Sequence, residues 1–363
     1  MPAPCYVCGA ESIVEGLCPR CYRESHPLVH IDSPLSMQVC RRCGAVALPG
    51  GWKPILEHYV NATELLDLQI ALFISHEASL LNADVDLYHE IERQLDRVVD
   101  LSVVAHGKSH NELEAHEERI PVQIRISPAT CDTCGLMSGG YHNAVLQIRA
   151  QGRHLSEDEV ERISDIVTQM THDAYGRDVK AFVTSVERHK YGLDFKIGSE
   201  HLARRISDEI ESTFLAERKE NYKLISQEPG SKGKYRVTIV LRLPRFVAGD
   251  FLMVGGHPCQ AKAIAHGNLS CYDLVDGTTF AVNPRSSKWS SVEFICSEER
   301  KRRYTAVADC QGQSVLFMDL TSFATVEVDS KRLNVPVRVG DTVSALLLDD
   351  TLYVIELDET PAQ

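Results

Sequence analysis

The sequence lacks several features that would place it in large classes of proteins. No run of apolar residues approaches the roughly eighteen that a membrane-spanning helix needs. Nothing at its N-terminus resembles a signal peptide, so we expect a cytoplasmic protein in a reducing compartment. It has no Walker loop, Gly-x-Ser-x-Gly elbow, His-Glu-x-x-His motif or dinucleotide fingerprint. The sequence therefore predicts a multi-domain binding protein with no catalytic residues, no small-molecule substrate and no membrane partner.

The chain also lacks an excess of basic charge, since its 363 residues carry a formal net charge of −13. Most of the acidic excess lies in 61–120, which has 13 Asp and Glu residues against 4 Lys and Arg residues. The stretches 1–60 and 121–240 are neutral, because basic and acidic residues are equal in number, at 5 each in the first and 17 each in the second. These stretches can present local basic patches, so the net charge does not exclude a nucleic-acid partner.

Four Cys-x-x-Cys pairs stand out in the sequence. Two thiolates separated by two residues can face one metal ion, and two such pairs complete a closed tetrahedral zinc site, which is structural because no position is left for water. We therefore expect two structural Zn²⁺ ions, each bound by consecutive pairs: Cys5, Cys8, Cys18 and Cys21 for the first, and Cys40, Cys43, Cys131 and Cys134 for the second. A cross-braced arrangement that joins Cys5 and Cys8 to Cys40 and Cys43 has compatible spacing and is an alternative.

The residues that follow the pairs predict two kinds of finger. Gly9 permits a tight knuckle turn, and the segment after Cys21 can start a helix, as in a treble clef. Gly44 and Gly135 each follow a pair, which is typical of a zinc ribbon whose halves are separated by an insertion. We interpret the four isolated cysteines as small core residues: Cys259, Cys271, Cys296 and Cys310.

The insertion between the halves of the second site has the pattern of a small α+β unit. An amphipathic helix is expected from Thr63, 84–97 is ambiguous between helix and strand, and strands are expected at 98–105 and 120–126. The stretch 106–117 has three histidines without ligand spacing, so we interpret it as a solvated polar loop.

The rest of the chain predicts an α+β domain followed by two small β-barrels. The α+β domain is indicated by strands of alternating pattern and by a capping box at Ser156 to Glu159. We interpret 229–234 as a hairpin loop of this domain. Beyond it, short strands with regular turn signals indicate an SH3-like and then an OB-like barrel. The expected domains are 1–140, 141–245, 246–299 and 300–363.

Basic side chains near these elements are candidates for RNA contact. Arginines on zinc knuckles are held on a rigid backbone and suit phosphate recognition. The candidate residues are Arg20, Arg23, Arg41, Arg42, Arg149, Arg153, Arg302 and Arg303. The last two lie in 299–303, which we interpret as a linker.

Several motifs together resemble the family of nonsense-mediated mRNA decay protein 3, the export adaptor of the large ribosomal subunit. They are Cys131-Asp132-Thr133-Cys134, Gly139-Gly140-Tyr141, the run from Ala144 to Arg149, and Tyr191-Gly192-Leu193-Asp194-Phe195. Gly249-Asp250-Phe251 and Gly256-His257-Pro258-Cys259 are similar to the hypusine-containing translation elongation factor, but 265–269 has no lysine to modify.

The resemblance implies a ribosome biogenesis factor that binds rRNA and ribosomal proteins on the intersubunit face of the large subunit. It would act in late maturation or prevent premature subunit joining, and we expect a monomer. The sequence ends without an export signal or basic tail, so we expect an archaeal-type form of the family. The alternative is a zinc-finger adaptor between proteins of a non-ribosomal complex, which the net charge favours.

Overall fold

The structure is a computed structural model, and it describes residues 3–82, 84–226 and 234–358. Contacts divide the chain into two compact units, Met1–Tyr141 with Ala174–Phe182, and His142–Asp173 with Val183–Gln363. Among the described residues, no helix combines the length and the apolar character that a bilayer crossing requires.

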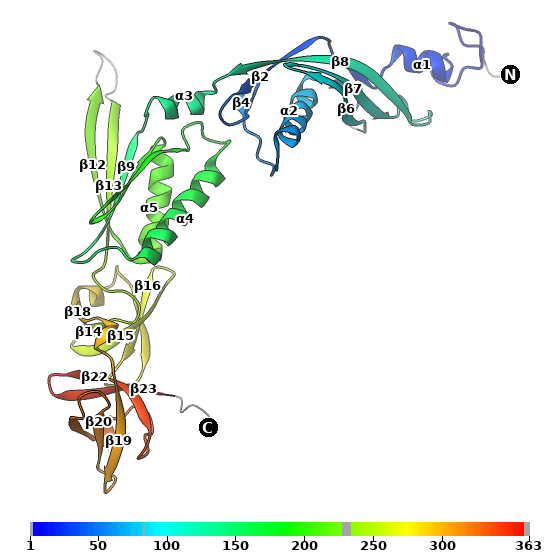
Figure 1. The fold of residues 1–363 in the computed structure, drawn as a ribbon. Coiled ribbons are helices and arrows are strands. Elements are labelled where there is room, and N and C mark those ends of the chain that lie inside the picture. The colour runs from blue at the N-terminus through cyan, green and yellow to red at the C-terminus, as the bar shows by residue number, and fades with distance from the viewer. Residues whose placement is uncertain (1–2, 83, 227–233, 359–363) are drawn as a thin grey trace. The chain divides into compact units, whose positions relative to one another are not determined.

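The first unit contains a six-stranded sheet in the order β4-β3-β2-β8-β7-β6 (Figure 1). Only β2 and β8 run parallel, with Cys40 opposite Ala129, so the last residues of both strands approach the second cysteine cluster together. The strands are β2 (Leu35–Cys40), β3 (Val46–Leu48), β4 (Gly51–Lys53), β6 (Asp86–Leu95), β7 (Val98–Gly107) and β8 (His116–Ala129). A separate small sheet joins β1 (Val29–His30) to β5 (Ser79–Leu80).

Helix α2 (Ala62–Glu77) packs on this sheet, as its apolar pattern predicted. Asn61 caps the helix, since its Oδ1 accepts hydrogen bonds from the backbone N–H groups of Thr63 and Glu64, both at 2.9 Å. Ile70 and Phe73 are buried against Met37, Val46, Leu101 and Ile124 of the strands. The sheet therefore has a hydrophobic core of its own, separate from both cysteine clusters.

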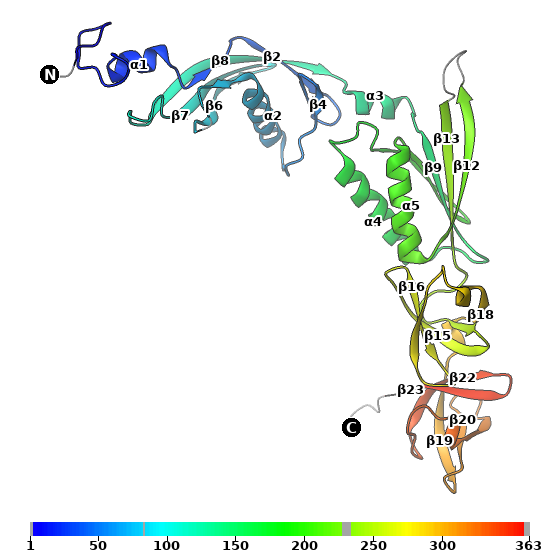
Figure 2. The same ribbon diagram turned by 180° about the vertical axis from the view of Figure 1, so that it is seen from behind.

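The second unit begins with a five-stranded sheet in the order β10-β11-β9-β13-β12, in which β9 and β13 are parallel. Its strands are β9 (Ala144–Ala150), β10 (Val183–His189), β11 (Gly192–Ile197), β12 (Glu217–Ser226) and β13 (Lys234–Leu243). Helices α4 (Glu157–Ala174) and α5 (Glu200–Phe214) lie side by side on one face of this sheet (Figure 2). Within the described residues, the opposite face carries no helix.

The caps predicted for both helices are confirmed. The backbone N–H of Glu159 donates to Ser156 Oγ at 3.1 Å, and the N–H of Ser156 donates to Glu159 Oε2 at 2.9 Å, which is a reciprocal capping box. Ser199 Oγ accepts a hydrogen bond from the N–H of Leu202 at 3.3 Å. Both helices thus begin where the side-chain chemistry of the sequence places them.

Gly192 occupies a position that admits no side chain. Its φ is +155°, and a Cβ there would lie 1.9 Å from the carbonyl oxygen of Ile148 on the neighbouring strand. The close approach of β11 to β9 therefore requires glycine in the Tyr191-Gly192-Leu193 stretch.

Two five-stranded barrels follow, as predicted. The SH3-like barrel has the strand order β17-β16-β15-β14-β18 and the OB-like barrel the order β21-β20-β19-β22-β23. Their elements are β14 (Phe251–Val254), β15 (His257–Ala265), β16 (Asn268–Asp273), β17 (Thr279–Val282), η1 (Ser287–Ser291), β18 (Val292–Cys296), η2 (Glu298–Arg300), β19 (Arg302–Cys310), β20 (Ser314–Asp319), β21 (Thr325–Asp329), η3 (Ser330–Arg332), β22 (Thr342–Leu348) and β23 (Thr351–Leu357).

The two barrels repeat one turn. Asp273 ends β16 and Asp319 ends β20, and Oδ1 of each accepts hydrogen bonds from backbone N–H groups two and three residues later. Burial opposes ionisation of Asp273, but these hydrogen bonds and the His257 ring hold its pKa below the usual range. The turns are therefore fixed by aspartate side chains that remain ionised at neutral pH.

Some expectations from the sequence need correction, and one concerns residues outside the described ranges. The ambiguous stretch 84–97 forms β6, because pairing with β7 decides between helix and strand. Cys259 and Cys271 are buried core residues as predicted and Cys296 is half-buried, but Cys310 is exposed at the end of β19. The predicted hairpin loop at 229–234 lies almost wholly outside the described residues.

Candidate metal centres

The first cysteine cluster brings together the side chains of Cys5, Cys8, Cys18 and Cys21. Their Sγ atoms all lie within 4.8 Å of one another, and Cys8 Sγ is 3.5 Å from Cys18 Sγ. Four thiolates around Zn²⁺ at about 2.3 Å would be separated by about 3.8 Å, so the cluster matches a tetrahedral site. The first pair lies on a knuckle with Gly9 at φ +78°, and the second opens α1 (Pro19–Ser25).

The second cluster joins Cys40 and Cys43 to Cys131 and Cys134 across the insertion. Its four Sγ atoms also lie within 4.8 Å of one another, with Cys43 Sγ 3.6 Å from Cys131 Sγ. Both predicted sets are therefore formed in sequence order, and the cross-braced alternative is wrong. The two four-cysteine clusters fit two structural Zn²⁺ ions.

Gly135 differs from its expected role as a knuckle glycine. Gly44 has φ +73° and ends a tight turn, whereas Gly135 lies within α3 (Asp132–Ser138). The second pair of this site thus opens a helix, just as the second pair of the first site does. A glycine after a cysteine pair therefore does not show whether the pair ends in a knuckle turn or opens a helix, because both conformations tolerate glycine.

Backbone groups favour the thiolate forms that a metal requires. Burial raises the pKa of Cys40, but hydrogen bonds from the N–H groups of Cys131, Cys43 and Arg42 outweigh burial and lower it to about 6. In the first cluster, the backbone N–H of Cys8 is the main group that lowers the pKa of Cys5 to about 6. The pKa of Cys21 is raised by the neighbouring thiols and those of Cys131 and Cys134 by burial, so the backbone favours the thiolate at the first cysteine of each site and not at all four.

Tyr175 is a contributor to the second site that sequence reasoning missed. It lies in Ala174–Phe182, which follows α4 but belongs by its contacts to the first unit. The pKa of Tyr175 is raised, first by burial and then by the nearby Cys43 thiol. Thr133 Oγ1 also donates to the carbonyl oxygen of Val179 at 3.0 Å. The segment thus supplies outer contacts to the metal ligands, and no spacing pattern in the sequence signals them.

The stretch 106–117, predicted as a solvated polar loop, is mostly exposed, but two of its side chains pack on the first cluster. Leu113 is 4% exposed and belongs to the same hydrophobic cluster as Cys5, Cys18 and Tyr22. The His110 ring makes an edge contact with the Tyr22 ring at 5.6 Å. The prediction missed these two contacts because a single leucine among polar residues shows no periodicity.

The knuckle arginines are exposed or partly exposed. Arg20 makes an ion pair with Glu24 at 2.9 Å, and Arg23 donates to the carbonyl oxygen of Glu114 at 3.1 Å. Arg42 donates to Ser138 Oγ and so links the first pair of the second site to α3. Arg41 is exposed and has no side-chain partner within the described part of the chain.

The remaining candidate arginines serve the protein's own structure to different degrees. Arg149 pairs with Asp194 at 2.7 Å and donates to the carbonyl oxygen of Leu193. Arg153 forms two hydrogen bonds to the Glu159 carboxylate, at 2.7 and 2.8 Å. Both guanidinium groups are therefore committed to structural contacts, which argues against the predicted RNA role for these two residues.

Arg302 and Arg303 do not lie in a linker, because η2 and β19 occupy this stretch. Arg302 pairs with Asp319 at 3.2 Å and Arg303 with Asp358 at 2.7 Å. Both side chains are more than half exposed and stay candidates for RNA contact.

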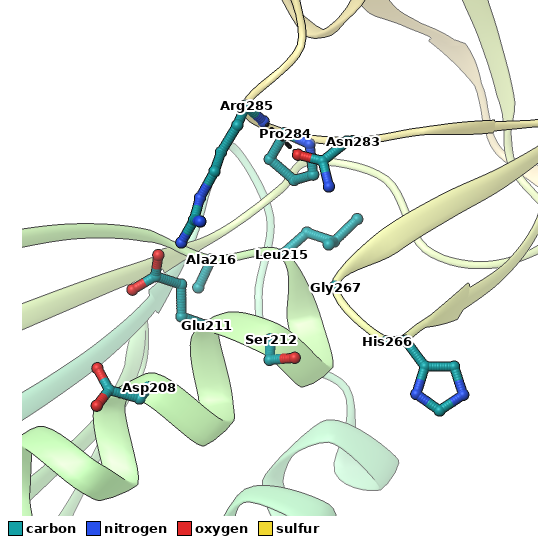
Figure 3. A pocket seen from close by; sticks show the side chains of 10 residues that line it. All are labelled: Asp208, Glu211, Ser212, Leu215, Ala216, His266, Gly267, Asn283, Pro284 and Arg285. Atoms are coloured by element: carbon teal, nitrogen blue, oxygen red, sulfur yellow. Dashed lines mark hydrogen bonds between the residues drawn. The ribbon is translucent and has the colours of Figure 1, made fainter.

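A pocket of about 400 Å³ lies between the end of α5 and the SH3-like barrel, and its lining side chains are drawn in Figure 3. Asp208 and Glu211 line one side, and Arg285 points toward Glu211. His266 lies in the tight turn of 265–269, and its ring points away from both carboxylates. The pocket therefore does not pair the His266 imidazole with either carboxylate.

These features define a multi-domain zinc-binding protein of α+β and β-barrel modules. The model of the NMD3 N-terminal domain matches residues 5–139, and the model of the NMD3 second domain matches residues 141–243. The chain therefore belongs to the NMD3 family, as the sequence motifs indicated. Membership makes it a ribosome-associated factor of large-subunit export or biogenesis.

Other comparisons add little. Comparison with curated proteins gives no match. Eukaryotic translation initiation factor 5A from Methanococcus jannaschii is 17% identical, with 31% of this chain and 90% of that chain covered and a TM-score of 0.21. An eIF-5A family protein from Naegleria fowleri is 16% identical, with 31% and 91% covered and a TM-score of 0.20. Scores of this size do not establish a shared fold.

Proposed function

We propose that this protein binds the intersubunit face of the large ribosomal subunit through rRNA and ribosomal proteins. There it acts in late maturation or prevents premature joining of the small subunit. The observation that carries the proposal is the match to both family domains over 5–139 and 141–243. The protein would work in the cytoplasm as a monomer, with no catalytic step of its own.

The construction of the chain supports this role. Several modules in one chain can each make a weak contact, and the contacts add through effective concentration. The exposed arginines beside the zinc ligands, Arg20, Arg41 and Arg42, are rigidly placed cations suited to phosphate. Arg23, Arg302 and Arg303 would add further contacts. The four predicted domains, 1–140, 141–245, 246–299 and 300–363, are the proposed binding modules.

A subunit-joining assay tests the proposal. Purified large subunits are incubated with the protein, small subunits are added, and joined ribosomes are measured by gradient centrifugation. A protein on the intersubunit face reduces joining in proportion to its occupancy. Occupied large subunits that join small subunits at the normal rate would contradict the proposed face.

The adaptor function is the alternative, and the net charge of −13 favours it. In that case, the protein would form a complex with a defined protein partner from an extract and would not associate with purified large subunits. The same gradients distinguish the two functions.

A further inference from the structure

The uncovered face of the five-stranded sheet carries a regular array of charges. Buried apolar residues alternate along its strands and point toward α4 and α5, as Leu146, Phe195 and Ile239 show. The residues between them point to the uncovered face, and strand register places paired residues on the same side. Its charged residues are Arg149, Glu187, Asp194, Lys196, Glu217, Lys219, Lys223, Arg236 and Arg242.

Each carboxylate of this face is neutralised by a cation on the same face. Lys196 pairs with Glu187 and Arg149 with Asp194, both at 2.7 Å, and Lys219 pairs with Glu217 at 3.0 Å. Three cations remain without a carboxylate partner among the described residues: Lys223, Arg236 and Arg242. All three lie on β12 and β13. The surplus positive charge is therefore concentrated on one pair of strands.

The helical face of the same domain has the opposite charge. Helix α4 carries six Asp and Glu residues against one Arg, and α5 carries four against two. A domain with one acidic and one basic face is oriented by a polyanion, because the acidic face is repelled while the basic face is attracted.

We propose that the uncovered face of this sheet, along β12 and β13, binds the phosphate backbone of double-stranded RNA. The inference rests on the proposed ribosomal function and names the surface and the chemistry within it. Arg236 and Arg242 are six residues apart on β13, which separates them by about 20 Å along the strand, enough to contact several phosphates.

The composition of the face favours an RNA backbone over a protein or unpaired bases. The side chains between the charges include the polar Gln147, Asn221 and Thr238 and two small apolar residues, Val145 and Val240. A protein interface would need an apolar or aromatic centre, and unpaired bases would need aromatic rings on which to stack. The described residues of this face offer no Phe, Tyr or Trp.

The test measures affinity for purified large subunits against salt concentration, with the full chain and its variants. Lys223→Gln and Arg242→Gln each remove one exposed cation that no other described side chain uses. We expect the slope of log affinity against log salt to fall by about one for each variant and by about two for the pair. Arg205→Gln, an exposed position on α5, is the matched control and leaves the slope unchanged.

The outcomes separate this inference from the proposed function. Wild-type protein that binds large subunits while both variants keep its slope would overturn the inference and leave the function standing. Weaker binding at every salt concentration with an unchanged slope would identify a protein contact and would also overturn it. No binding by the wild-type protein at any salt would remove the proposed function itself. Arg242→Lys keeps the charge and should keep the slope, and far-UV circular dichroism verifies that each variant is folded.

Discussion

The two zinc sites each have four cysteine thiols, but they are built into the fold in different ways. In the first site, the ligands lie between Cys5 and Cys21, and three of them make up much of a small cluster completed by Val14, Leu17, Tyr22 and Leu113. In the second site, Cys43 and Cys131 are 88 residues apart, and the ligands close the end of a sheet that has its own large core. The metal is thus the centre of the first finger. In the second site, it is a cross-link at the end of a sheet that has its own core.

This difference separates two roles of metal binding in folding. A structural zinc contributes on the order of 10 kcal/mol or more to the folding free energy of a small finger. The first site has only a small hydrophobic cluster besides its metal to oppose unfolding. In the second site, the α2 helix and six strands bury a hydrophobic cluster without help from the ligands. Loss of the metal should therefore unfold the first site completely and the second only at its edge.

The largest effect is expected from Cys18→Ser. The variant should bind one zinc instead of two, and residues 3–26 should become sensitive to protease because their small cluster cannot fold without the metal. Zinc stoichiometry by mass spectrometry and limited proteolysis measure this. The control is Cys310→Ser, an exposed cysteine outside both clusters. A protease-resistant finger in the one-zinc variant would show that packing alone holds the site.

Cys131→Ser should have a more restricted effect. It also removes one zinc, but hydrogen exchange should remain slow in β7 and β8, whose residues belong to the sheet core, and become fast in β4 and α3. Rapid exchange throughout β7 would contradict the independence of that core.

Leu113→Ala tests a distant buried side chain that packs on the first site. Removing a buried leucine side chain costs about 2–5 kcal/mol, so a chelator should extract the first zinc faster while the second is unaffected. Leu95→Ala, at a position 63% exposed, is the control and should change neither rate. Equal acceleration at both sites would mean that Leu113 stabilises more than the first finger.

Tyr175→Phe is the smallest change, since it removes only a hydroxyl that lies near the Cys43 thiol. Losing an outer contact to a metal ligand lowers metal affinity by about ten-fold or more, so zinc competition should show a weaker second site. Tyr59→Phe, at an exposed position, serves as the control. Unchanged affinity in Tyr175→Phe would make the contact incidental.

The sequence was most informative where the signal is local. Cysteine spacing identified both four-cysteine clusters, and caps at Ser156 and Ser199 located two helices, because each depends on residues a few positions apart. It missed Leu113 and Tyr175, whose roles arise from contacts with distant parts of the chain. Strand β6 was ambiguous because pairing with β7 decides its conformation.

The sequence also did not show which arginines are used by the fold and which stay exposed. Arg149 and Arg41 are alike in sequence as cations near a structural motif. The fold commits Arg149 to Asp194 and to the tight β9 to β11 approach at Gly192, while it leaves Arg41 exposed. Charge alone therefore cannot separate a binding residue from a structural one before the strand register is known.

The most direct test of the account is cosedimentation of the full chain with separated ribosomal subunits of its own organism, at low and high salt. We expect the protein to migrate with the free large subunit at low salt, to be absent from joined ribosomes, and to dissociate as salt rises, since phosphate contacts are screened. A protein that stays at the top of the gradient at every salt concentration would contradict large-subunit binding and favour the adaptor function.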